Sequence, residues 1–248
     1  MRVAAIFDIH GNLPALEAVL DDIRGAAVDE LVVGGDVFPG PMPLDVLSRL
    51  ASFSIPVRYI KGNGDRVVLA AKSGGDISEV PPPYQDVVRW AADTLSPEQA
   101  RKVAVWPASL RVRVGGLGDV HFCHATPRND TEIFTRLTAE SRLLPVFQGI
   151  DVPLVVCGHT HMQFDRTVGT TRVVNAGSVG MPFGQPGAYW LLLGPGVELR
   201  RTTYDLSRAA DRIRGTKYPQ ADAFAAQSVL HPPSEEQMLA AYSRVELR

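Results

Sequence analysis

Residues 3 to 12 read Val3-Ala4-Ala5-Ile6-Phe7-Asp8-Ile9-His10-Gly11-Asn12. The apolar run at the start of this stretch predicts a buried β-strand, and the Gly-Asn pair at its end predicts a tight turn. Because side chains alternate faces along an extended chain, Asp8 and His10 project to the same side where the strand stops. The stretch therefore ends in a pair of candidate metal ligands.

Four later stretches repeat this arrangement, in which an apolar run ends in polar side chains that bind hard divalent metals. The runs end at Gly34-Gly35-Asp36, Gly62-Asn63-Gly64-Asp65, His124 and Gly158-His159-Thr160-His161. In open α/β sheets, active sites lie at the carboxyl ends of the strands. We therefore expect all five stretches to deliver ligands to one edge of the molecule.

Taken in order, the motifs Asp-x-His, Gly-Gly-Asp, Gly-Asn-x-Asp, His and Gly-His-x-His resemble those of the calcineurin-like metallophosphoesterase superfamily. The resemblance covers about residues 3–180 and is specific, because each of the five motifs follows an expected strand. The stretch from Asp8 to Leu16 is similar to the small bacterial phosphodiesterase-type members. The resemblance implies an α/β fold of two packed mixed β-sheets flanked by helices, an α/β/β/α sandwich with a small helical cap.

The order of predicted elements agrees with this architecture. Strand and helix patterns alternate at first, which favours a mostly parallel sheet, and from Leu110 onward paired strands predict antiparallel pairing in a second sheet. Residues from 66 to about 108 break the rhythm with helical patterns, so we place an inserted cap there. We expect Tyr84, Trp90 and Trp106 to anchor the cap as core residues, with substrate stacking as the alternative.

The predicted domains are a metallophosphoesterase domain over residues 1–205 and a C-terminal helical extension over residues 206–248. The helices of the extension carry no ligand pattern. We expect them to pack on the domain, and a homo-oligomer formed through them is the alternative.

The composition excludes several classes of function. With 25 basic and 27 acidic residues the net charge is −2, so the chain has no basic track for a nucleic acid and no general attraction to an anionic membrane. A nuclease is therefore disfavoured. The two cysteines, Cys123 and Cys157, lie inside predicted strands and are expected to be small core residues rather than a disulfide.

Localisation is predicted from what the sequence does not contain. Met1-Arg2-Val3 leads into a strand without the charged and apolar regions of a signal peptide, and no apolar run approaches the roughly 18 residues that span a bilayer. We expect a cytoplasmic protein with a small phosphorylated substrate.

Carried over residue by residue, the resemblance implies a centre of two divalent metals. One metal would take Asp8, His10, Asp36 and His161, and the other would take Asp36, Asn63, His124 and His159. Asp36 would bridge the two cations and offset their repulsion. Oxygen and imidazole ligands without thiolate suit Mn²⁺, Fe or Zn²⁺. Mn²⁺ is the metal that we expect, with Fe, Zn²⁺ and Ni²⁺ as alternatives.

The expected chemistry is attack on phosphorus by a hydroxide that bridges the two metals. Asp36 and Asn63 would act as ligands, and Asp65 would orient a ligand imidazole by accepting its hydrogen bond. Many superfamily members have a histidine where this chain has Gly64. Losing a positioned acid costs ~10²–10⁴-fold when the leaving group is poor. We therefore expect aryl phosphodiesters or nucleotide anhydrides to be hydrolysed faster than alkyl phosphomonoesters.

Three further side chains are candidate substrate contacts. Asn12 could face the substrate phosphate, although capping the helix that follows is the simpler role. Arg128 and Arg66 lie near enough in sequence to the motifs to hold a phosphate through a bidentate pair, with a surface salt bridge as the alternative for each. Ser178 is expected to form a plain turn, and His121 matches no ligand position.

Two other classes of function compete with a phosphodiesterase or nucleotide hydrolase. Relatives of this fold, including a retromer subunit, are protein-interaction scaffolds with weak or absent catalysis, and Gly64 favours that alternative. The complete set of seven ligand residues favours an enzyme. A protein phosphatase is the third candidate.

Overall fold

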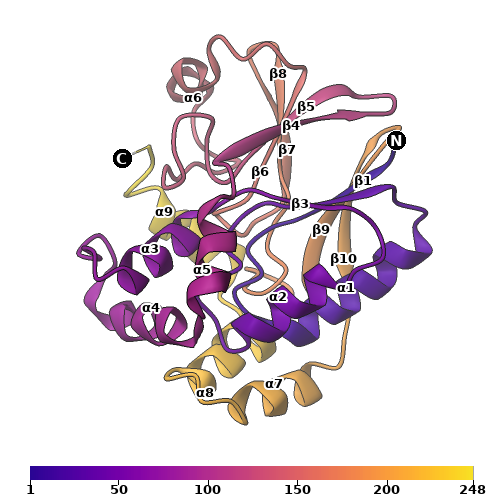
Figure 1. The fold of residues 1–248 in the computed structure, drawn as a ribbon. Coiled ribbons are helices and arrows are strands. Elements are labelled where there is room, and N and C mark those ends of the chain that lie inside the picture. Colours follow the sequence, from indigo (N-terminus) through magenta and orange to yellow (C-terminus); the bar gives the residue numbers. More distant parts are fainter. Residues whose placement is uncertain (248) are drawn as a thin grey trace.

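The structure, a computed structural model, describes residues 1–247 and contains two five-stranded β-sheets that pack face to face (Figure 1). The first sheet has the order β10 (Val197–Thr202), β9 (Ala188–Leu193), β1 (Val3–Ile6), β2 (Glu30–Val33) and β3 (Val57–Tyr59). The second has the order β4 (Ser109–Val114), β5 (Gly118–Cys123), β6 (Leu154–Cys157), β8 (Thr171–Asn175) and β7 (Phe164–Val168).

Both sheets are mixed. In the first sheet β1, β2 and β3 are parallel and β9 runs antiparallel to β1. In the second, the predicted antiparallel pairing is correct for the hairpins β4–β5 and β7–β8. The centre is parallel, as mixed sheets require: β5, β6 and β8 run in the same direction because a long connection containing α6 (Glu140–Phe147) separates β5 from β6. Parallel strands from both sheets therefore end at the same edge.

The apolar residues form three layers that account for the sandwich. Alternate residues of β1 point to opposite faces, so Val3 and Ala5 join the core between the sheets while Ala4 and Ile6 face the helices. Helices α1 (Leu13–Gly25) and α2 (Pro43–Ala51) cover the outer face of the first sheet, and α6 covers the second. The α/β/β/α sandwich predicted from the sequence is confirmed.

The cap consists of α3 (Asn63–Lys72), α4 (Pro82–Thr94) and α5 (Pro97–Ala104), and its first helix begins inside the third motif. Trp106 stacks on Tyr59 with ring centroids 4.7 Å apart, and Trp90 packs edge-on against Tyr218 at 5.4 Å. These two tryptophans are packing anchors, as predicted. Tyr84 is not a core residue, because 55% of its surface is exposed.

The C-terminal segment comprises α7 (Leu206–Arg214), α8 (Ala221–Phe224), the π-helix η1 (Ala225–Leu230) and α9 (Glu235–Tyr242). Ala209, Ile213 and Phe224 join the apolar cluster that α1 and the cap share. The Gln220 amide also donates to Pro83 O at 2.7 Å, so α8 lies beside α4 (Figure 1). The segment thus packs on its own chain. Arg248, the last residue of the predicted extension, lies outside the described residues.

Among the described residues, no helix has both the length and the apolar character needed to cross a bilayer. Cys123 and Cys157 are both free and buried, which fits the expectation of core residues.

Candidate metal centre

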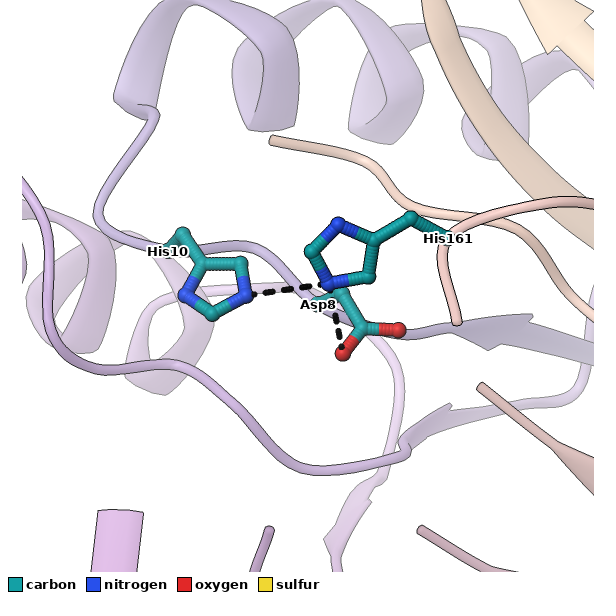
Figure 2. A group of neighbouring side chains, drawn as sticks. All are labelled: Asp8, His10 and His161. Carbon is teal, nitrogen blue, oxygen red and sulfur yellow. Dashed lines mark hydrogen bonds and ion pairs between the residues drawn. The ribbon is translucent and has the colours of Figure 1, made fainter. Parts of the chain in front are cut away.

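The five motifs meet at one edge of the sandwich. Two groups of side chains each bring their potential ligand atoms within 4.8 Å of one another: Asp8, His10 and His161, and Asp36, His124 and His159. Figure 2 shows the first group, in which side chains from two distant parts of the chain converge.

Asp36 lies between the two groups. Its Oδ1 is 3.5 Å from His124 Nε2, and its Oδ2 is 3.7 Å from His10 Nε2. Asn63 joins the second group, because its Oδ1 lies 3.0 Å from His124 Nε2. The structure therefore brings together all seven residues predicted to be ligands, with the predicted bridge in the middle.

One carboxylate oxygen that faces the centre lacks the partner that a buried polar atom needs. Asp8 Oδ1 is buried without a hydrogen-bond partner among the described residues, 3.4 Å from His161 Nε2. The Nε2 atoms of His10 and His161 are 3.3 Å apart and point toward each other (Figure 2). A cation placed among these lone pairs would satisfy all of them, so the residues present fit a divalent metal.

Carbonyl groups behind the imidazoles set their orientation. His124 Nδ1 donates to Gly34 O at 2.9 Å, and His161 Nδ1 donates to Met181 O at 2.8 Å, so each presents Nε2 to the centre. His159 is reversed, because its Nε2 lies 3.2 Å from Thr131 O and Nδ1 remains for a metal. Main-chain oxygens thus fix the orientation of these rings.

The backbone at the centre is strained. Non-glycine residues rarely adopt a positive φ. Five of the seven predicted ligand residues have one: Asp8 (54°), His10 (46°), Asp36 (52°), His159 (65°) and His161 (58°). Such strain persists where the surrounding structure imposes it, and it concentrates at functional sites.

A comparison with protein families agrees with this geometry. The family model for the calcineurin-like phosphoesterase superfamily domain matches residues 1–193. The chain belongs to this superfamily.

Relatives share the fold over nearly the full length of this phosphoesterase-superfamily chain. Uncharacterized protein MJ0912 of Methanocaldococcus jannaschii is 25% identical over 239 residues, which cover 88% of this chain and 94% of that protein. The structure is similar to that of hypothetical protein PH1004 from Pyrococcus horikoshii OT3, with a TM-score of 0.80, 20% identity and coverage of 94% and 99%. It is also similar to a metallophosphoesterase from Sphaerobacter thermophilus, with a TM-score of 0.70, 24% identity and coverage of 92% and 100%.

Burial and mutual charge shift the pKa values of this superfamily member's acidic and imidazole groups. Burial opposes charge on Asp36, but the adjacent His124 outweighs it and holds the pKa of Asp36 well below its usual range. Burial likewise opposes charge on His124, yet Asp36 raises the pKa of His124 to about 10. Asp36 and His124 thus each stabilise the charged form of the other.

Asp65 does not orient a ligand imidazole, so that prediction is wrong. It is fully buried, and its carboxylate accepts hydrogen bonds from the backbone N–H groups of Asp36 (2.9 Å), Phe38 (3.1 Å) and Gly62 (2.9 Å). Burial and the nearby Asp36 raise the pKa of Asp65 to about 7, against the lowering effect of the amides. Asp65 therefore ties the second motif loop to the third instead of contacting a ligand ring.

The residues predicted to contact substrate instead form hydrogen bonds or ion pairs within the chain. Asn12 is fully buried and caps α1, since its Oδ1 accepts from Ala15 N and its Nδ2 donates to Gly180 O at 2.9 Å. Arg66 pairs with Glu79 and with Asp130, where Nε donates to Oδ2 at 2.7 Å.

Arg128 pairs with Glu132. The simpler alternative given for each of the three residues is therefore the one that the structure supports. Ser178 is also structural, because its Oγ donates to Asp8 O at 2.8 Å.

A cavity of about 370 Å³ opens beside the metal-facing side chains. His10, Asp36, Asn63 and Gly64 line one end, and its walls come from the cap and the C-terminal segment. No sequence pattern marked the wall residues Tyr218, Phe224 and Gln227, because Tyr218 lies in the connection before α8 and the other two lie in α8 and η1, which carry no motif. The one available hint was aromatic side chains in an extension without ligands.

Proposed function

We propose that this protein is a metal-dependent phosphoesterase that hydrolyses phosphodiester or nucleotide-type substrates at a centre of two divalent cations. The observation that carries the proposal is the pair of acid–imidazole groups joined through Asp36, with Asp8 Oδ1 buried and unpaired among the described residues. The superfamily membership supports the same class of chemistry.

The proposed ligand sets follow the two groups. Asp8, His10, Asp36 and His161 would hold one cation, and Asp36, Asn63, His124 and His159 would hold the other. Divalent cations bound there would lower the pKa of an attacking water and offset charge on the phosphoryl oxygens. The chain's own part is to fix the ligand atoms, through the carbonyls behind the imidazoles and through the loops that Asp65 ties together. Mn²⁺ is the cation that we propose.

The leaving group must depart without an acid at position 64. A Cβ built on Gly64 would lie 2.3 Å from Phe38 O, so this backbone has no room for the histidine found in many relatives. Good leaving groups need protonation least. We therefore propose that aryl phosphodiesters and nucleotide-type substrates are turned over faster than alkyl phosphomonoesters.

The test is hydrolysis of aryl phosphodiesters, aryl phosphomonoesters, serine phosphate and dinucleoside polyphosphates, with and without Mn²⁺. We expect Mn²⁺-dependent turnover of the aryl diesters that Asp36→Ala abolishes. Activity that survives Asp36→Ala would show that the hydrolysis arises elsewhere. Comparable rates on serine phosphate and an aryl diester would contradict the proposed leaving-group preference.

A metal-binding scaffold with weak or no catalysis is the second candidate, and the absent side chain at Gly64 favours it. The two candidates differ in one outcome. The scaffold predicts that Mn²⁺ binds and raises the unfolding temperature while no phosphoester is hydrolysed, because ligand binding stabilises a fold whether or not turnover follows.

A further inference from the structure

The cavity beside the metal-facing side chains has walls that differ in chemistry from its end. Asn63 and Gly64 lie at the end near the predicted ligands, whereas Val87 and Val88 of α4 contribute apolar wall. Tyr84 stands at the rim with more than half of its surface exposed. A volume of about 370 Å³ falls in the range of small-molecule sites.

Tyr218 and Phe224 form the wall that the C-terminal segment supplies, and their rings are fixed. Tyr218 makes edge-on contacts with Trp90 at 5.4 Å and with Phe224 at 6.0 Å. Burial raises the pKa of the Tyr218 hydroxyl above its usual value, so the ring is uncharged at neutral pH. Fixed aromatic surface offers stacking and edge contacts at little cost in side-chain entropy.

The helix that supplies this wall is unusual. The chain changes from α8 to the π-helix η1 directly after Phe224, and Gln227 and Ser228 of η1 also line the cavity. A π-helix is rare and is frequently found at functional sites. The wider turn therefore coincides with the stretch that faces the cavity.

The cavity has no free positive charge. Its lining among residues 1–247 includes no lysine or arginine. Glu79 is the one acidic residue there besides Asp36, and it pairs with Arg66, which also pairs with Asp130. A second phosphate or a carboxylate in the cavity would lose its hydration without gaining a counter-charge.

We propose that this cavity binds an uncharged aromatic ring of the substrate, either an aryl group or a nucleobase, while the phosphoester lies at the predicted ligands. The inference rests on the proposed function for the position of the phosphate, and it deepens that function by naming the substrate class. It also narrows the substrate class. Because no lysine or arginine among the described residues lines the cavity, substrates with polyphosphate chains are disfavoured relative to monophosphate diesters.

The kinetic test compares methyl 4-nitrophenyl phosphate with an analogue that carries a carboxylate on the ring and has a matched leaving-group pKa. A dinucleoside monophosphate is the nucleobase arm. We expect kcat/KM for the neutral ring to exceed that for the charged ring by about tenfold or more, the size of one lost aromatic contact. Because kcat also depends on the leaving group, the two arms are compared by KM: a lower KM for the dinucleoside would identify the ring as a base, and a higher one as an aryl group. Equal values for the neutral and charged rings would overturn the inference.

Substitutions of lining residues test whether the ring binds in this cavity. Tyr84→Ala removes an exposed side chain without threatening the fold, and we expect it to raise KM for the neutral ring about tenfold. Phe224→Leu, which keeps an apolar wall, should give a smaller rise. Val105→Ala, a cap residue with 80% of its surface exposed, is the matched control and should leave KM unchanged. The same KM for Tyr84→Ala and Val105→Ala would contradict the proposal.

A binding measurement separates this inference from the proposed function. Metal-free protein is titrated with 4-nitroanisole, whose ring stays uncharged at all pH values used, and quenching of tryptophan fluorescence is followed, because Trp90 contacts the Tyr218 wall. We expect saturable quenching that Tyr84→Ala weakens about tenfold. If no substrate is hydrolysed but this quenching is seen, the proposed function fails and the ring-binding cavity stands. Hydrolysis without saturable quenching and without ring discrimination overturns the inference alone.

Discussion

The two ends of the cavity are built in opposite ways. The metal-facing end consists of short, strained loops at strand ends, where five predicted ligand residues have positive φ and Asp65 joins two loops through three backbone amides. The opposite end consists of helical faces, contributed by α4, α8 and η1. The first end is fixed by backbone geometry, while the second is shaped by side-chain packing. Substitutions should therefore affect chemistry and stability at the first end, and substrate choice at the second.

The largest effect is expected for His161→Ala, which tests whether the metal-facing end acts as a unit. Losing a ligand should lower kcat by more than about 10²-fold, the upper range of what partners outside the ligand shell cost. It should also reduce Mn²⁺ stoichiometry from two to one by calorimetric titration. His231→Ala is the matched control, because His231 is exposed and follows η1. An unchanged Mn²⁺ stoichiometry in His161→Ala would show that His161 is not a metal ligand.

Asp65→Ala tests how rigidly the two loops are joined. Three buried N–H groups would lose their acceptor, at about 1–3 kcal/mol each, so the free energy of unfolding should fall by about 3 kcal/mol or more. Asp65→Asn keeps one oxygen and should lose less. Urea denaturation measures both. Equal losses in the two variants would show that the hydrogen bonds are not what stabilises this end.

Gly64→Ala and Gly25→Ala compare a crowded glycine with an open one. A Cβ at Gly64 would lie 2.3 Å from Phe38 O, so overpacking should cost roughly 1–3 kcal/mol of stability. At Gly25, the last residue of α1, a Cβ would meet nothing within 4 Å, and alanine should stabilise by about 0.4–1 kcal/mol. Thermal unfolding of both proteins gives the difference. A stabilising Gly64→Ala would mean that the loop yields, and that position 64 could accommodate a side chain.

The smallest effect is expected for Arg66→Gln, at the boundary between the two ends. Arg66 is partly exposed, and such ion pairs contribute about 0–1 kcal/mol each to stability. KM for an aryl diester should change by less than about tenfold, within the 1.4 kcal/mol that a factor of ten represents. A much larger rise in KM would indicate that Arg66 binds the substrate phosphate.

The predictable part of the molecule is the part in which short-range pattern dictates position. Apolar runs followed by Asp8, Asp36 or His124 predicted strand ends, and the structure brings those ends together at one edge. The role of these residues as ligands stays a prediction. The sandwich and the location of the cap followed from the same patterns and from the family resemblance.

The rest depends on contacts between residues far apart in sequence. Arg66 could be a phosphate ligand or an ion-pair partner, and only the fold reveals Asp130 beside it, 64 residues later. The role of Asp65 depends on where the amides of Asp36 and Phe38 arrive. Tyr218 and Phe224 reach the cavity through the packing of the C-terminal segment, which leaves no spacing pattern in the sequence. The sequence shows the chemical type of each of these side chains, but only the fold shows which residue each one contacts.

The left-handed conformations also affect which residues would replace the predicted ligands in evolution if metal binding were lost. At a positive φ, glycine is tolerated better than aspartate or histidine. Once cation binding ceased to matter, replacement at positions 8, 10, 36, 159 and 161 would relieve strain as well as remove buried charge. Drift toward glycine there would be favoured by the fold itself. Proteins of this fold that bind partners without binding metal should therefore have glycine more often at these five positions.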